Sequence, residues 1–262
     1  MTIVLDCIIL ICLINIGAKT YNYYKDNKTY DNIRNLKGED LNTSNNIDDS
    51  SNHEKEIYQK LKAVNSDYKF WIIIDDTVVD YPVVQGEDND FYLNNNFYKE
   101  KSISGTIFLD YENDEAQDKN LILYGHNMRD GSMFASINKF KEKDFFDNGK
   151  IKIVTENGEE TYEVFSVFVE KASDINLKAS FSSNEEYNEY INSLKEKSYY
   201  KKEIKDKNNE VEKIDKVNEI ENINKEANET SISNDLKKII TLYTCSYEFE
   251  DARTVVCATL VE

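Results

Sequence analysis

The sequence predicts a mainly β fold, a barrel of eight largely antiparallel strands with helices in the connections. Three observations predict this class. Eight short segments are apolar or alternate between apolar and polar residues, Gly, Asn and Asp separate them, and only a few stretches repeat apolar residues at helical spacing. With 262 residues, 40% of them hydrophobic, the chain can bury the core of one domain.

The N-terminal segment is apolar. Residues 3–16 contain one charge, Asp6, and Lys19 follows them. This run is shorter than the roughly 20 residues that a helix needs to cross a bilayer. A cleaved secretory signal is the alternative, but no basic residue precedes the apolar run and Ile-Gly-Ala at 16–18 is a poor cleavage site. On these residues alone, both an anchor and a signal peptide stay open.

The next segment, residues 19–52, is polar and charged with little periodicity, which predicts a flexible stalk between membrane and domain. From residue 53 onward Ile57, Leu61 and Val64 recur at helical spacing, so an amphipathic helix is expected to pack on the domain. The domain would then occupy residues 53–262.

Six strands are predicted between this helix and the C-terminal region. They comprise residues 70–74, 78–84, 106–109, 120–124, 150–155 and 161–169. Helices are predicted in two connections, at residues 132–140 and 184–200. The second helix would place its apolar residues on one face, namely Tyr187, Tyr190, Ile191 and Leu194.

A charged segment at residues 201–235 precedes the C-terminal strands. It contains no aromatic residue, Gly or Pro, and its apolar residues form only a thin stripe. This composition favours a solvated insertion, helical or disordered. A lid over the substrate or a partner-binding segment is the alternative, because the insertion leads directly into the next strand.

The C-terminal region carries the best indication of chemistry. Residues 238–243 and 254–261 predict two buried antiparallel strands joined by a polar connection, which would bring Cys245 and Arg253 to the same end of a sheet. A thiol becomes a useful nucleophile when a nearby cation or base favours the thiolate. We therefore interpret Cys245 as a candidate nucleophile.

The chain has two histidines that could serve as the base. His53 lies in a polar stretch, whereas His126 follows an apolar run where a strand should give way to a loop, so His126 is the better candidate. Arginine occurs only at positions 34, 129 and 253, and a guanidinium can hold a carbonyl oxygen that gains negative charge. Taken singly, each residue has a simpler alternative: a packed thiol, a structural imidazole or a surface cation.

Composition excludes several other classes of function. The net charge of −18 argues against binding nucleic acid, which draws on clustered Lys and Arg. The four cysteines, at 7, 12, 245 and 257, form no CxxC pair, so no zinc site is expected. Neither a phosphate-binding glycine loop nor an HExxH helix is present, so we expect no metal or other cofactor.

Four motifs resemble those of sortases, the cysteine transpeptidases of Gram-positive cell envelopes. Thr-Leu-Tyr-Thr-Cys at 241–245 with Arg253 is similar to the family's cysteine signature, and Leu-Tyr-Gly-His-Asn-Met at 123–128 resembles the histidine segment of class B. Two further stretches, 80–89 and 105–110, agree with class B and stand in the family's order. The resemblance runs from about residue 58 to residue 261.

The resemblance implies a closed eight-stranded barrel, an N-terminal helix and a helix-bearing connection before the cysteine strand. It also implies catalysis by Cys245, His126 and Arg253, and cleavage after Thr of a sorting signal of the Asn-Pro-x-Thr or Ser/Asn-Pro-x-Thr-Gly type. The released acyl group would be joined through a thioester to a peptidoglycan amine. A substrate groove is expected to include Asn89, Leu93, Tyr124, Tyr243 and Thr244.

For partners and location, the resemblance implies secreted proteins that carry a sorting signal, a peptidoglycan amine as acceptor, and a monomeric enzyme outside the cell. It favours an uncleaved membrane anchor at residues 1–18. The alternatives for function are a pilus-polymerising class C sortase, a hydrolytic cysteine peptidase and an inactive wall-binding module. Three departures from the family pattern affect substrate choice: Tyr243 replaces a small Ser, Ser246 replaces an acid, and the charged insertion is long.

Overall fold

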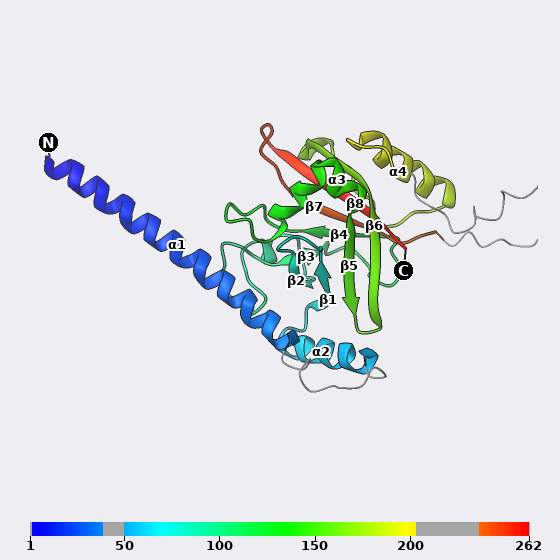
Figure 1. The fold of residues 1–262 in the computed structure, drawn as a ribbon, viewed down its shortest axis with the longest axis horizontal. Coiled ribbons are helices and arrows are strands. Elements are labelled where there is room, and N and C mark those ends of the chain that lie inside the picture. The colour runs from blue at the N-terminus through cyan, green and yellow to red at the C-terminus, as the bar shows by residue number, and fades with distance from the viewer. Residues whose placement is uncertain (1, 39–49, 203–235, 262) are drawn as a thin grey trace, which may run out of the picture.

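The barrel predicted from the sequence is present and closed. The computed structural model describes residues 2–38, 50–202 and 236–261. Around the barrel the strands follow the order β1-β2-β3-β4-β7-β8-β6-β5 (Figure 1). Their bounds are Tyr68–Ile73 (β1), Asp80–Val84 (β2), Ile107–Leu109 (β3), Asn120–Tyr124 (β4), Lys150–Thr155 (β5), Gly158–Lys171 (β6), Ile239–Cys245 (β7) and Ala252–Leu260 (β8).

Most neighbouring strands are antiparallel, as expected, but two pairs are parallel. These pairs are β2 with β3 and β4 with β7. Strand β7 therefore lies between a parallel partner, β4, and an antiparallel partner, β8. Because parallel strands end at the same edge, the C-terminal ends of β4 and β7 open onto one rim of the barrel.

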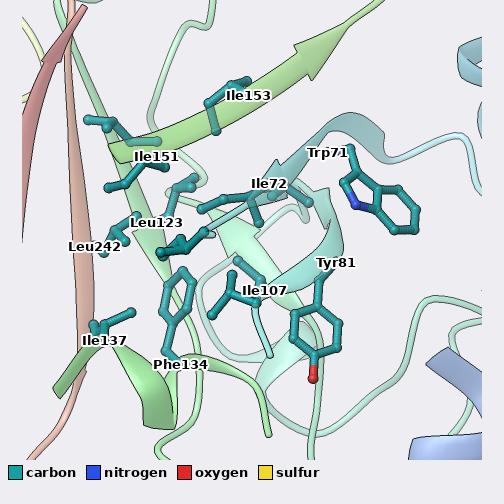
Figure 2. Close-up of a cluster of buried hydrophobic side chains, with 14 of the residues drawn as sticks. Trp71, Ile72, Tyr81, Ile107, Leu123, Phe134, Ile137, Ile151, Ile153 and Leu242 are labelled. Atoms are coloured by element: carbon teal, nitrogen blue, oxygen red, sulfur yellow. The ribbon is translucent and has the colours of Figure 1, made fainter. Parts of the chain in front are cut away.

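Apolar side chains fill the barrel interior and hold the strands together. Figure 2 shows a cluster of buried apolar side chains, with labelled members from β1 to β5, β7 and the helical turn after β4. Leu123, Ile107 and Phe134 are fully buried there. Full burial of one such side chain stabilises the folded state by about 1.5–3 kcal/mol, so this interior fixes the strand register on which the rim depends.

Helical elements occupy the connections, including the two predicted ones. The segment predicted at 132–140 is a 3-10 helix, η4 (Phe134–Lys141), followed by α3 (Lys143–Asp147). The segment predicted at 184–200 is α4 (Asn184–Lys197), which packs on β6 and buries the four predicted apolar residues. The remaining helices are α1 (Thr2–Gly38), α2 (Ser50–Val64), η3 (Phe91–Leu93) and η5 (Ala172–Asp174).

The expectation of a flexible stalk after residue 18 is wrong as far as Gly38. Residues 19–38 continue the helix α1 without a break, and the second half of α1 packs against the barrel (Figure 1). Tyr30 and Ile33 are buried, and buried Asp26 accepts hydrogen bonds from the amides of Ile103 and Ser104 at 3.1 Å each. The few apolar residues of this segment therefore form a face that docks on the barrel. They are too sparse in the sequence to predict this face.

The first half of α1 leaves its apolar side chains exposed. Among the described residues α1 is long and apolar enough to cross a membrane, and the same features are typical of a signal sequence. Residues 39–49 of the predicted stalk and 203–235 of the predicted insertion lie outside the described residues.

Candidate functional site

The candidate nucleophile lies at the end of β7, opposite the arginine. Cys245 is the last residue of β7, and its direct partner across the antiparallel ladder is Arg253, the second residue of β8. Both residues are partly exposed. The sequence prediction that an antiparallel pair brings these two residues to one end of a sheet agrees with this register.

The guanidinium of Arg253 is held beside the thiol by its other neighbours. It forms an ion pair with Asp251 at 2.8 Å and donates to the carbonyl oxygen of Ala252 at 3.0 Å. Burial works to lower the pKa of Arg253, but the negative charges that Cys245, Tyr243 and Asp251 can carry outweigh it and raise that pKa. The site therefore keeps a permanent positive charge next to the sulfur.

The candidate base lies on the neighbouring parallel strand. Tyr124, at the end of β4, is opposite Tyr243 of β7, so His126 and Cys245 each lie two residues beyond a paired position. The amide of Gly125 donates to the carbonyl oxygen of Tyr243 at 3.3 Å, which extends the pairing past the strand. The rim thus brings His126, Cys245 and Arg253 onto three adjacent strand ends.

Two side chains fasten the histidine loop to the cysteine strand. Asn127 donates from its amide to the carbonyl oxygen of Cys245 at 2.8 Å, and Thr244 donates from its hydroxyl to the carbonyl oxygen of Gly125 at 2.7 Å. A side chain at Gly125 would have to enter the ring of Phe134, since an added Cβ would lie 2.7 Å from it. Glycine is therefore required for this close packing.

The imidazole of His126 is oriented by a backbone carbonyl. Its Nε2 lies 2.8 Å from the carbonyl oxygen of Leu93, the last residue of the turn η3. A carbonyl oxygen can only accept, so Nε2 carries the hydrogen of this bond and the neutral ring keeps its lone pair on Nδ1. The third member of a catalytic triad orients its base by a hydrogen bond of this kind.

The carbonyl of Leu93 is itself held by a tight turn. Gly105 adopts a φ of +59°, and an added Cβ there would lie 2.5 Å from the carbonyl oxygen of Tyr92 and 2.7 Å from that of Leu93. The amide of Thr106 also donates to the carbonyl oxygen of Tyr92, at 2.9 Å. The segment before β3 therefore supports the segment that orients His126.

Two of the predicted groove residues converge on one carboxylate. Asn89 donates from its amide to Asp110 at 3.0 Å, and Tyr124 donates from its hydroxyl to the same oxygen at 2.8 Å. Burial, followed by the charge of Asp110, raises the pKa of Tyr124, so the phenol stays protonated as a donor. In the turn that follows, the carboxylate of Asp88 accepts from the amides of Asp90 and Phe91.

Tyr243, the departure from the family's small residue, packs against Tyr124. Their ring centroids are 5.3 Å apart in an edge-to-face arrangement at 72°. Burial raises the pKa of Tyr243 despite the opposing effect of Arg253. An aromatic pair thus stands beside the cysteine, where the family pattern would leave more space.

The remaining predicted groove residues are Leu93 and Thr244. Leu93 is partly buried against the core, and Thr244 is only 1% exposed with its hydroxyl engaged by Gly125. Thr244 therefore holds the loop rather than lining a groove. Three supporting residues, Asp110, Asn127 and Asp251, are not predicted from the sequence, although the first two lie inside motifs that resemble those of the family.

The remaining cysteines have no part in this arrangement. All four thiols are free, and Cys7 and Cys12 are exposed on α1. Cys257 is fully buried in β8, and burial raises the pKa of its thiol to about 12. Across the described ranges, no group of three or more His, Cys, Asp and Glu side chains could hold a metal ion.

Comparison with known proteins assigns the chain to a family. The model of the sortase domain matches residues 72–261. The structure superposes on a sortase B variant from Clostridium perfringens with a TM-score of 0.72 and 36% identity, covering 90% of this chain and 99% of that one. The chain belongs to the sortase family, in its class B branch. The eight-stranded barrel and its N-terminal helices are those of sortase B structures.

Two curated relatives agree. Sortase B of Listeria monocytogenes is 39% identical over 148 residues, and sortase B of Staphylococcus aureus is 29% identical over 154 residues. The matches cover 55% and 58% of this chain, and 60% and 63% of those relatives' own length. A Staphylococcus aureus sortase B–substrate complex shares the fold at a TM-score of 0.71 and 23% identity, covering 91% of this chain and 97% of that one.

Proposed function

We propose that this class B sortase is a cysteine transpeptidase that transfers the acyl end of a cleaved sorting signal to an amine. The observation that carries the proposal is the meeting of Cys245, Arg253 and His126 at three adjacent strand ends. A thiol, a permanent cation and an oriented imidazole are the groups that acyl transfer through a thioester requires. The family assignment supports the same chemistry.

In the first half-reaction the sulfur of Cys245 attacks the carbonyl carbon of the peptide bond after Thr. The thiol proton passes to Nδ1 of His126, and the imidazolium then gives it to the departing amine as the C–N bond breaks. Arg253 donates to the carbonyl oxygen while that oxygen carries negative charge. The product of this half-reaction is a thioester on Cys245 and a free amine.

In the second half-reaction an incoming amine attacks the thioester carbon. His126 takes the proton of that amine and returns it to the sulfur as the C–S bond breaks, so the enzyme is regenerated. The bond between Nε2 of His126 and the carbonyl of Leu93 supports both steps, because it keeps Nδ1 available for the proton in each direction.

The sorting signal would bind beside the cysteine in a groove that includes Asn89, Leu93, Tyr124 and Tyr243. We propose signals of the Asn-Pro-x-Thr or Ser/Asn-Pro-x-Thr-Gly type on secreted proteins, and a peptidoglycan amine as acceptor. A relative of this chain was solved as a sortase B–substrate complex, which supports a peptide-binding site on this barrel. The enzyme would act as a monomer through the domain at residues 53–262.

We further propose that the apolar half of α1 anchors the protein in the cell membrane, with the barrel on the outer face. The exposed apolar side chains of this half support the assignment. Protease treatment of intact cells should remove the barrel and leave the anchor. A barrel that resists protease until the cells are broken would contradict the outward orientation.

A single assay tests the proposed reaction. The full chain is incubated with a fluorogenic sorting peptide, with and without an amine acceptor, beside Cys245→Ala as control. We expect cleavage and formation of the amide with the acceptor, both lost in Cys245→Ala. Cleavage without transfer would indicate a hydrolytic peptidase, and no cleavage of any sorting peptide would indicate a binding module.

A further inference from the structure

Asp26 is a buried carboxylate on the docked half of α1. It is 3% exposed, and one of its oxygens accepts hydrogen bonds from the amides of Ile103 and Ser104 at 3.1 Å each. Burying a carboxylate is costly unless hydrogen bonds replace its water, and an apolar side chain would dock a helix without this cost. The carboxylate binds two successive amides instead, so it fixes the backbone of residues 103 and 104.

Tyr30, one helical turn after Asp26, contacts the next two residues of the same segment. Its buried hydroxyl donates to the carbonyl oxygen of Gly105 and lies 3.1 Å from the hydroxyl of Thr106. Residues four apart lie on the same face of a helix, so Asp26 and Tyr30 act together on one side of α1. Between them they contact all four residues of segment 103–106, which leads into β3.

Segment 103–106 is bonded in turn to the backbone on both sides of Leu93. The amide of Thr106 donates to the carbonyl oxygen of Tyr92, and its hydroxyl donates to that of Asn95, both at 2.9 Å. Leu93 stands between these two anchored positions. A displacement of segment 103–106 would therefore move the backbone around Leu93.

Leu93 is the residue whose carbonyl orients the proposed base. Its oxygen lies 2.8 Å from Nε2 of His126, and an added Cβ at Gly105 would lie 2.7 Å from the same oxygen. Gly105 is also the residue whose carbonyl oxygen accepts from Tyr30. Two residues in close contact, Gly105 and Leu93, therefore connect Tyr30 to the imidazole.

The later contacts of α1 end on β2 instead of segment 103–106. Arg34 donates to the carbonyl oxygen of Asp80 at 3.2 Å, and its guanidinium carbon lies 5.3 Å from the ring centroid of Tyr81. The helix thus has two sets of docking contacts. The set formed by Asp26 and Tyr30 leads to the base.

We propose that Asp26 and Tyr30 are positioning residues for the base, because through segment 103–106 they hold the carbonyl that orients His126. The inference rests on the proposed transpeptidase function and extends the catalytic unit into the docked half of α1. Misplacing a catalytic group by about 1 Å can lower a rate by about 100-fold, so loosening this carbonyl slows the reaction although neither residue touches substrate.

Two substitutions that preserve side-chain shape test the inference in the full chain in detergent. Tyr30→Phe removes only the hydroxyl, and Asp26→Asn removes the charge, which about halves the strength of such hydrogen bonds. We expect each to lower kcat for cleavage of a sorting peptide by about tenfold, with KM changed by less than about twofold. Arg34→Gln is the matched control, because it also removes one hydrogen bond from α1 to a backbone carbonyl, that of Asp80.

The orientation of the base is measured separately from activity, through the nitrogen resonances of isotope-labelled histidine. In the parent chain Nε2 carries the hydrogen when the ring is neutral, because it donates to Leu93. We expect both test variants to show a mixture of the two tautomers, and Arg34→Gln to keep the parent tautomer. His53→Gln assigns the resonances, since His53 and His126 are the two histidines of the chain.

Three results would overturn the inference. They are an unchanged tautomer in both test variants, a changed tautomer without loss of kcat, and an equal change in Arg34→Gln, which would assign the effect to docking of α1 in general. If circular dichroism shows that Tyr30→Phe is unfolded, Asp26→Asn decides. The tautomer is measured without substrate, so it still decides whether these residues orient His126 if the parent chain cleaves no sorting peptide, a result that would refute the proposed function alone.

Discussion

At the scale of single residues, the proposed reaction depends on the geometry of Arg253 as well as on its charge. It lies opposite Cys245 in the ladder and is positioned by its ion pair with Asp251. A guanidinium offers a planar fork that can hold Asp251 and a substrate oxygen at once, whereas an ammonium is a single point of charge. A side chain that supplies only the positive charge should therefore not replace Arg253.

We expect Arg253→Lys to lower kcat for peptide cleavage by about 100-fold, the loss typical of removing one donor to a developing oxyanion. Steady-state cleavage of a sorting peptide measures this effect, and circular dichroism verifies that the barrel is folded. A lysine variant with nearly unchanged kcat would show that the positive charge is sufficient and that no directed donor is needed.

Gly105 illustrates how a residue without side-chain chemistry can control the base. A Cβ at this position would collide with the carbonyl of Leu93, which orients His126, and its φ of +59° is unfavourable for alanine. We expect Gly105→Ala to reduce cleavage and to shift the imidazole resonances of His126 in NMR spectra. Gly131→Ala is a suitable comparison, since Gly131 also has a positive φ but an added Cβ there meets nothing within 4 Å. Equal effects of the two substitutions would indicate backbone strain alone.

At the scale of elements, the β7–β8 connection is held to the barrel by a small polar network. Lys141 of η4 donates to Ser246 at 3.0 Å and forms an ion pair with Glu248, which also accepts from Ser246. Burial opposes ionisation of Glu248, but the bonds from Lys141 and Ser246 outweigh it and lower the pKa of Glu248 to about 2. This network lies directly after Cys245.

A pKa lowered by folding means that the ionised form of Glu248 stabilises the folded connection. That stabilisation is fully present above the ordinary pKa of 4.5 and is lost as the pH falls toward 2. We expect hydrogen-exchange protection of the Ser246 amide, which donates to Ala252, to fall over this interval. Glu248→Gln should remove the pH dependence; a variant with the same profile as the parent chain would assign it to another group.

The elements of the barrel could be predicted from the sequence, because each strand carries its own pattern of apolar residues. The site could be predicted only in part. Cys245 and Arg253 are joined by a short connection, so their pairing follows from local sequence, and His126 was singled out by its place after an apolar run. The carbonyl of Leu93 and the carboxylate of Asp110 could not be found this way, since their roles depend on contacts between segments far apart in the chain.

The helix α1 marks the clearest difference between sequence and structure. Its second half was predicted to be a stalk because its buried residues are few and widely spaced among polar ones. Tyr30, Ile33 and Asp26 nevertheless find complementary partners on the barrel, which only the assembled fold provides. Tertiary contacts here determine a structure that local composition does not specify.

At the scale of the whole molecule, α1 joins an exposed apolar half to a half that is docked on the barrel. The helix is continuous through Gly17, so the barrel cannot rotate freely about the apolar segment as it would on a flexible stalk. The orientation of the rim then depends on how firmly the second half is docked. Ile33 is fully buried in this contact, whereas Leu36, one turn later, is 40% exposed.

We expect Ile33→Ala to lower the free energy of unfolding by about 2–4 kcal/mol, the range for deleting a buried aliphatic side chain, and Leu36→Ala to have a much smaller effect. Urea denaturation of the full chain in detergent, followed by the fluorescence of Trp71, measures both. Trp71 is suitable because Lys37 of α1 lies 4.8 Å from its ring, so undocking of the helix changes its surroundings. If α1 moves independently of the barrel, the two substitutions should be equivalent, and the orientation argued for the catalytic rim would lose its structural basis.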